Sequence, residues 1–174
     1  DKTGTLTQNE MTVVEGWTAR KRFKVTGEGY SPSGQFLIED RPFETAGDAD
    51  AKLLLHGALL CNDAMLERRT DDAGTQSWRI IGDPTEGAMA VVAMKAGFER
   101  RVLESTMPRV QEIPFDSDRK RMTTIHTTGG APLAFVKGAP DVVLDLCTHV
   151  RKNGEAVPLG EAERRQVLEQ NRDL

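Results

Sequence analysis

Apolar side chains recur at helical spacing in two parts of the chain. The first is a leucine-rich stretch between Leu53 and Leu60, which follows the candidate N-cap residues Asp48 and Asp50. An aspartate at this position can accept hydrogen bonds from the first free backbone amides of a helix. The pattern therefore predicts a helix that begins after these aspartates, ends near Asn62 and turns its apolar face towards the core.

A second helix is predicted between Asp83 and Gly97. Asp83 suits the N-cap position, Pro84 the first helical position and Glu86 the third, which is the arrangement of a capping box. The apolar residues that follow stop at Gly97, a residue type that commonly ends helices. A further helix is predicted to start after the turn of residues 138–140.

Short extended segments alternate with these helices. The strands predicted from alternation and from β-branched or aromatic residues cover residues 11–17, 23–26, 36–38, 78–81, 110–115, 122–128 and 132–137. Gly129-Gly130 joins the last two as a β-hairpin, and residues 67–77 are predicted to form a polar hairpin or loop. Strands joined as hairpins, with helices between them, indicate an α+β fold with a largely antiparallel sheet flanked by helices.

The composition is that of a globular domain. Of the 174 residues, 38% are hydrophobic and 29% are charged, and the net charge of −4 indicates neither a nucleic-acid nor a lipid partner. Cys61 and Cys147 are isolated in the sequence, so we expect reduced thiols and no metal site built on them. No run of about eighteen apolar residues is present, so no direct membrane contact by this chain is expected.

The first seven residues, Asp-Lys-Thr-Gly-Thr-Leu-Thr, place a carboxylate at the start of a turn rich in hydroxyl groups. A carboxylate that attacks the terminal phosphoryl group of ATP needs close backbone approach, which Gly4 permits, and donors for the charged oxygens. The stretch resembles the phosphorylation signature of P-type ATPases, ion pumps that form a covalent aspartyl-phosphate. The resemblance implies that Asp1 is the catalytic nucleophile, and the alternative is an ordinary terminal turn.

Thr3 bears on the kind of phosphate chemistry. Phosphatases of the related haloacid-dehalogenase type carry Asp-x-Asp here, and their second Asp hastens loss of the phosphate as a general acid and base. With Thr3 in that place, an acyl phosphate on Asp1 is expected to persist and to drive a conformational change. The resemblance further implies that Asp1 and the Thr3 carbonyl hold Mg²⁺ in the intact pump, with carboxylates absent from this chain.

Three further stretches carry the same resemblance across most of the chain. They are residues 82–89 (GDPTEGAM), 114–123 (PFDSDRKRMT) and 135–141 (FVKGAPD). In P-type ATPases the corresponding segments form the nucleotide-binding domain, which is inserted just after the phosphorylated Asp. Residues 61–63, Cys-Asn-Asp, are similar to the second, cation-specific subfamily, which includes calcium pumps.

The resemblance implies a domain organisation and a function. Residues 1–9 would be a stub of the phosphorylation domain, and residues 10–174 a nucleotide-binding domain shortened at its C-terminal end. The implied partners are ATP, Mg²⁺ and the remaining phosphorylation, actuator and transmembrane domains of a cation pump in the plasma or inner membrane. This cytoplasmic piece is expected to bind ATP without turnover. The alternatives are an autonomous nucleotide-binding module and a haloacid-dehalogenase-like phosphatase fragment.

Four residues are candidate nucleotide contacts in the second half of the chain. Phe115 lies among charged residues, and the resemblance implies that its ring stacks on adenine, whereas the alternative is that it packs on the sheet. Lys120 and Lys137 are placed by the resemblance along the path of the adenosine and the phosphates. Gly138 would leave the backbone open to a ligand. Lys137 follows apolar neighbours and is expected to be partly desolvated, whereas Lys95 is expected to be a solvated surface lysine.

Glu86 has two competing explanations. A capping-box glutamate at the third helical position accounts for it without any ligand. The resemblance instead has this residue accept a hydrogen bond from the adenine amino group. One departure from the animal calcium pump is Ser117, which stands where that pump has an arginine and leaves fewer fixed charges near the phosphates.

Overall fold

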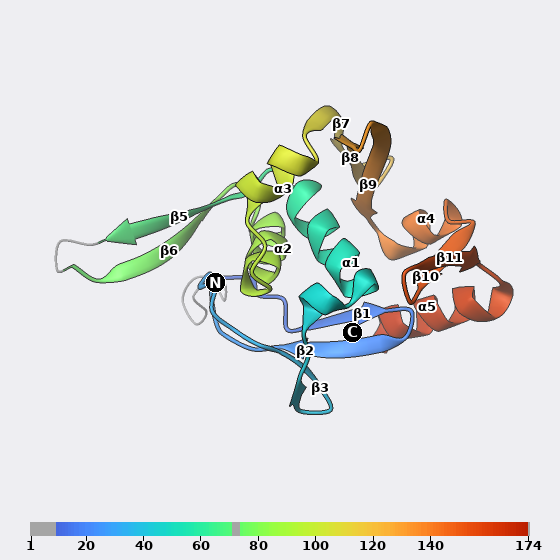
Figure 1. The fold of residues 1–174 in the computed structure, drawn as a ribbon, viewed down its shortest axis with the longest axis horizontal. Coiled ribbons are helices and arrows are strands. Elements are labelled where there is room, and N and C mark those ends of the chain that lie inside the picture. Colours follow the sequence, from blue (N-terminus) through green and yellow to red (C-terminus); the bar gives the residue numbers. More distant parts are fainter. Residues whose placement is uncertain (1–9, 71–73, 174) are drawn as a thin grey trace.

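The structure is a computed structural model that describes residues 10–70 and 74–173. The predicted nucleophile Asp1, the predicted magnesium ligand Thr3 and the rest of segment 1–9 lie outside the described residues. The helices are α1 (Ala49–Leu60), α2 (Pro84–Lys95), α3 (Arg100–Thr106), α4 (Pro140–Asp145) and α5 (Glu161–Asp173), with a 3₁₀ turn η1 (Thr45–Gly47) before α1. Helix α1 occupies the centre and packs against α2, α3, β1 and β9 (Figure 1).

The strands of the described residues form four antiparallel sheets. The first is β1 (Glu15–Thr18), β2 (Lys21–Val25), β3 (Phe36–Ile38) and β4 (Arg41–Pro42), and the second is the pair β5 (Met65–Thr70) and β6 (Gln76–Ile81). The third is β7 (Arg109–Asp116), β8 (Arg121–Thr128) and β9 (Ala131–Gly138), and the fourth is β10 (His149–Lys152) and β11 (Glu155–Pro158). The α+β class with antiparallel pairing is confirmed, with the strands distributed over separate sheets around α1 (Figure 1).

Helices α1 and α2 begin at the predicted N-caps. The Asp48 carboxylate accepts hydrogen bonds from the amides of Asp50 and Ala51 at 3.1 and 2.9 Å, and it also pairs with Lys21. Burial opposes ionisation of Asp48, but these bonds outweigh it and lower the pKa of its carboxyl. Asp83 accepts from the amides of Thr85 and Glu86 at 2.8 and 3.1 Å. The local signals in the sequence therefore set both helix starts.

The hydrophobic core lies between α1, α2 and the inner faces of the first and third sheets. Its members include Phe23, Leu55, Leu59, Ala93 and Met122, all at most 2% exposed. Burying a large apolar side chain of this kind contributes about 1.5–3 kcal/mol relative to leaving it in water. This core fixes the C-terminal end of α1 against β8 and the start of α2 beside it, which positions the candidate site.

Several elements differ from the sequence predictions. The first strand begins at Glu15 and not at residue 11, and both α3 and the β10–β11 hairpin were missed. Helix α3 has no side-chain cap and buries only Leu103, so its sequence carries little helical signal. Lys95 is 9% exposed, and its ammonium donates to the carbonyls of Thr26 and Gly27, so the expectation of a solvated lysine was wrong. Burial lowers its pKa.

Candidate nucleotide-binding site

The candidate site begins at the N-terminus of α2. Asp83 caps the helix, and the amide of Glu86 is the main cause of the lowered pKa of its carboxyl, with the Thr85 amide and hydroxyl adding to it. Pro84 stands at the first helical turn, where a missing amide proton costs nothing. The predicted half of the capping box in which Asp83 accepts from the helix amides is therefore confirmed.

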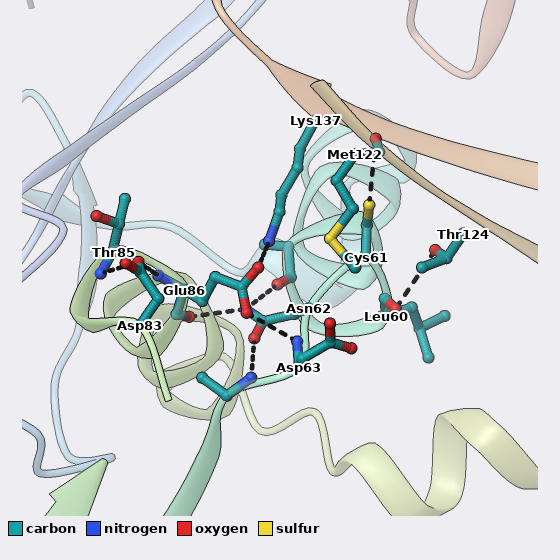
Figure 2. Close-up of polar contacts among 12 residues, drawn as sticks. Leu60, Cys61, Asn62, Asp63, Asp83, Thr85, Glu86, Met122, Thr124 and Lys137 are labelled. Atoms are coloured by element: carbon teal, nitrogen blue, oxygen red, sulfur yellow. Dashed lines mark hydrogen bonds and ion pairs between the residues drawn. The ribbon is translucent and has the colours of Figure 1, made fainter. Parts of the chain in front are cut away.

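The Glu86 carboxylate is turned away from the capping role. One of its oxygens accepts from the Lys137 ammonium at 2.5 Å, and the other accepts from the Asp63 amide at 2.9 Å (Figure 2). The side chains of Glu86 and Lys137 are 17% and 20% exposed, so the ion pair is only partly reached by solvent. The carboxylate thus joins the α2 start to β9 and to the segment after α1, and both oxygens keep a lone pair for a ligand.

Phe115 stands at the end of β7 with its ring in solvent. The pairs Ile113–Thr123 and Asp116–Arg121 leave one extra residue on β7, which is a β-bulge. Bulges re-aim side chains out of the regular alternation, and Phe115 is 63% exposed. The alternative that Phe115 closes the strand by packing on the sheet is not supported by this exposure.

These side chains surround one cavity of ≈ 540 Å³. Its lining is formed by Asp83, Thr85, Glu86, Met89, Phe115, Lys137, Gly138 and Ala139. The volume lies within the range typical of small-molecule pockets, and the lining combines apolar surface with a few polar groups. The structure therefore brings together four of the five predicted nucleotide contacts, Glu86, Phe115, Lys137 and Gly138.

Lys120 does not line this cavity. It lies in the turn between β7 and β8 with a positive φ of 51°, and its side chain is exposed. Its carbonyl accepts from the Ala139 amide at 3.1 Å. A Cβ on Gly138 would lie 2.4 Å from this same carbonyl oxygen, so the glycine is needed for the close approach of β9 to the turn. A glycine at position 138 is therefore required by the fold, in addition to forming part of the cavity wall.

A second hollow of ≈ 480 Å³ shares Met89 and Lys137 with the first cavity. Its walls come from α1, the end of β1 and β9, and its lining is largely apolar, with Leu54 and Val136 exposed. Of its charged side chains, Asp50 and Arg151 pair with each other at 3.2 Å, and Lys137 pairs with Glu86. Its lining includes neither Phe115 nor Glu86.

The described residues contain no cluster of three or more His, Cys, Asp or Glu side chains that could hold a metal ion. The magnesium ligands expected from the sequence, Asp1 and Thr3, lie in the undescribed segment. Within residues 10–70 and 74–173, no helix is long and apolar enough to cross a membrane.

The sequence interpretation missed the contribution of residues 62 and 63. Asn62 donates from its side-chain amide to the Glu86 carbonyl at 2.7 Å, and Asp63 supplies the amide that holds the Glu86 carboxylate. In the sequence, the Cys-Asn-Asp stretch indicates only a resemblance to a subfamily. Met89, one turn beyond Glu86 on α2, was also missed as an apolar wall of the cavity, although its helical spacing from Glu86 could have indicated it.

The α+β fold described above agrees with a comparison against known families. The chain belongs to the P-type ATPase family, because residues 50–174 match the model for the P-type ATPase cytoplasmic domain N. The phosphatase-fragment alternative is not favoured by this membership.

Relatives in several organisms support the assignment. The probable cation-transporting ATPase F of Mycobacterium bovis is 43% identical over 164 residues, which cover 93% of this chain and 18% of the relative. The cation-transporting ATPase pma1 of Synechocystis is 38% identical over 97% of this chain and 19% of its own length. The calcium-transporting ATPase of Bacillus subtilis is 36% identical over 90% of this chain and 17% of its own length. The chain therefore spans less than a fifth of these relatives.

Proposed function

We propose that this chain is the ATP-binding part of a cation-transporting P-type ATPase and that it holds the adenine in the cavity between Phe115 and Glu86. The observation that carries the proposal is an exposed aromatic ring and a partly buried carboxylate on the walls of one cavity. Phe115 is 63% exposed and lies outside the hydrophobic core, so its ring is accessible for stacking on a planar base.

The chemistry of the cavity fits an adenine base. Glu86 has one lone pair left on each oxygen after its bonds to Lys137 and Asp63, so it can accept from the adenine amino group. Met89 supplies apolar surface beside the ring of Phe115. A stacked base with one charge-assisted hydrogen bond needs no further charge from the protein.

The phosphates are held more weakly than the base. The Lys137 ammonium is already paired with Glu86, so its attraction for an anion is partly cancelled. Lys120 is exposed in the neighbouring turn and adds a solvated charge, which steers the nucleotide but contributes little binding energy. Dissociation constants between micromolar and millimolar follow, or about −4 to −8 kcal/mol.

In the intact pump, the proposed role of Asp1 is to attack the terminal phosphoryl group and form the aspartyl-phosphate. Mg²⁺ held by Asp1 and Thr3 would neutralise charge on the transferring phosphoryl group. The remaining phosphorylation, actuator and transmembrane domains would convert this step into cation movement across the plasma or inner membrane. Several relatives are named as calcium or cation transporters, and we propose cation transport for this protein on that basis.

A titration of the isotope-labelled chain with ATP, followed by NMR, tests the binding proposal. Saturable shifts are expected for the amides of Thr85, Glu86, Gly138 and Ala139, which line the cavity. Amides of the second hollow, such as Leu54 and Val150, serve as the internal control and should move little. Absence of saturable shifts at millimolar ATP would overturn the proposed function.

A further inference from the structure

Asn62 is a completely buried polar residue at the junction of the two central helices. Its exposed fraction is 0%, and it follows directly on the last turn of α1. Buried side-chain amides are kept where all their hydrogen bonds are made, because an unpaired one is costly. The partners of Asn62 therefore indicate what it holds in place.

The Asn62 side chain connects three pieces of backbone. Its Nδ2 donates to the Ala58 carbonyl at 2.9 Å and to the Glu86 carbonyl at 2.7 Å, and its Oδ1 accepts from the Ala64 amide at 2.9 Å. Ala58 lies in the last turns of α1 and Glu86 in the first turn of α2. One amide group therefore joins the end of one helix to the start of the other (Figure 2).

The segment that contains Asn62 is itself held by two arginines. Arg100 and Arg109 donate to the Asn62 carbonyl at 2.9 and 2.8 Å, and Arg109 also pairs with the Asp63 carboxylate at 2.7 Å. Burial opposes the charge of Arg109, but its bonds to Asp63 and Glu112 outweigh this and raise its pKa. The Asn62 carbonyl and the Asp63 side chain are thereby both held in place.

The fixed backbone is the one that orients the carboxylate of the site. The Asp63 amide donates to one oxygen of Glu86, while Lys137 holds the other. Asn62 holds the Glu86 main chain, and the residue after it holds the Glu86 side chain. Because both the main chain and the carboxylate oxygens of Glu86 are hydrogen-bonded, the side chain has little freedom to turn away from a ligand.

We propose that Asn62 is a positioning residue for adenine recognition, which acts by holding Glu86 in the orientation that accepts the adenine amino group. This inference rests on the proposed function, since it concerns the same cavity. It assigns a role in base selectivity to a residue that does not line the cavity and would not touch the nucleotide. Loss of the Asn62 amide is expected to reduce the preference for a 6-amino purine more than the affinity for purines in general.

The test compares AMP with IMP, which carries an oxygen in place of the 6-amino group. The unaltered 174-residue chain is expected to bind AMP more tightly than IMP. In Asn62→Ala, AMP affinity should fall about threefold to tenfold, the effect of one weakened hydrogen bond, while IMP affinity changes less than about twofold. In a Glu86→Gln background, Asn62→Ala should leave the AMP to IMP ratio unchanged, because the residue through which it acts is already altered.

Thr124→Val is the matched control. Thr124 is also 0% exposed and also donates to the end of α1, at the Leu60 carbonyl, but it makes no contact with Glu86 (Figure 2). This substitution should lower the thermal midpoint and leave the AMP to IMP ratio as it is in the unaltered chain. A merely structural role for Asn62 predicts the same behaviour for Asn62→Ala, namely a lower midpoint with an unchanged ratio, and that result overturns the inference.

If Asn62→Ala does not fold, a measurement on the unaltered chain still tests whether Glu86 accepts the adenine amino group, as the inference requires. The amide proton of Asp63, which bonds to Glu86, should shift farther on saturation with AMP than with IMP, because only AMP carries the amino group that donates to the carboxylate. Equal shifts overturn the inference. No AMP binding to the unaltered chain would instead overturn the proposed function itself, so the two failures are distinguishable.

Discussion

Replacement of Phe115 by alanine separates a binding role from a packing role. Phe115 is 63% exposed, so removal of its ring should cost little stability, within about 0.5 kcal/mol or about 2 °C in thermal midpoint for a chain of this size. A buried Phe would instead cost about 3–5 kcal/mol, or about 6–20 °C. If the ring stacks on adenine, the loss of about 1–3 kcal/mol of stacking weakens nucleotide binding by about 5-fold to 150-fold.

The assay is an NMR titration of Phe115→Ala and of the unaltered chain with AMP, ADP and ATP, with a melting curve for each. The three nucleotides should weaken by similar factors, because stacking involves only the base they share. Val110→Ala is the matched control, since Val110 lies on the same strand at 62% exposure and does not line the cavity. An AMP affinity that is unchanged in Phe115→Ala would refute the stacking role.

Three further predictions concern stability and chemistry. Asp83→Ala should lower the free energy of unfolding by about 0.5–2 kcal/mol at neutral pH, because the helix loses its N-cap. The pKa of Asp83 in the folded chain is below its usual 3.8, so this stabilisation is complete above the unfolded pKa and is lost as the pH falls through the folded pKa. Melting curves of both proteins at neutral and acidic pH will check this. Lys137→Met and Glu86→Gln should show a coupling energy of about 0.5–3 kcal/mol in a double-mutant cycle measured by denaturation, and additive effects would contradict the ion pair. The chain should release no phosphate from Mg²⁺-ATP, and sustained release abolished by Asp1→Asn would contradict this.

Signals confined to a few neighbouring residues gave correct predictions. The start of α1 at Asp48, the start of α2 at Asp83 and the β8–β9 hairpin around Gly129-Gly130 were all predicted, because each depends on side chains or turn residues next to it in sequence. The β10–β11 hairpin has the same kind of signal in Asn153-Gly154, with φ values of 56° and 84°, and could have been found.

Contacts between distant residues account for what the sequence could not predict. The capping box on α2 is a local pattern, and it correctly identified the Asp83 half. The direction of the Glu86 carboxylate depends on Asp63 and Lys137, which are 23 and 51 residues away in sequence. Local spacing does not indicate such pairs, so only the fold shows that the Glu86 carboxylate does not cap α2. Its contact with adenine stays a proposal.

The resemblance implies that Lys120 contacts the nucleotide, but Lys120 does not line the cavity. The motif that contains both Phe115 and Lys120 places only Phe115 in the cavity wall, since the turn between β7 and β8 directs Lys120 to solvent. Its role as a nucleotide contact stays a prediction. Lys120→Ala should weaken ATP more than AMP if the ammonium reaches the phosphates, and titration of the two nucleotides would show equal effects if it does not.

The most direct test of the proposed site is a nuclear Overhauser measurement on the chain saturated with AMP. We expect contacts from the adenine ring protons to the Phe115 ring and to the Gly138 backbone, because both line the same cavity. Contacts to Leu54 and Val150 instead, with none to Phe115, would place the base in the second hollow and contradict the account.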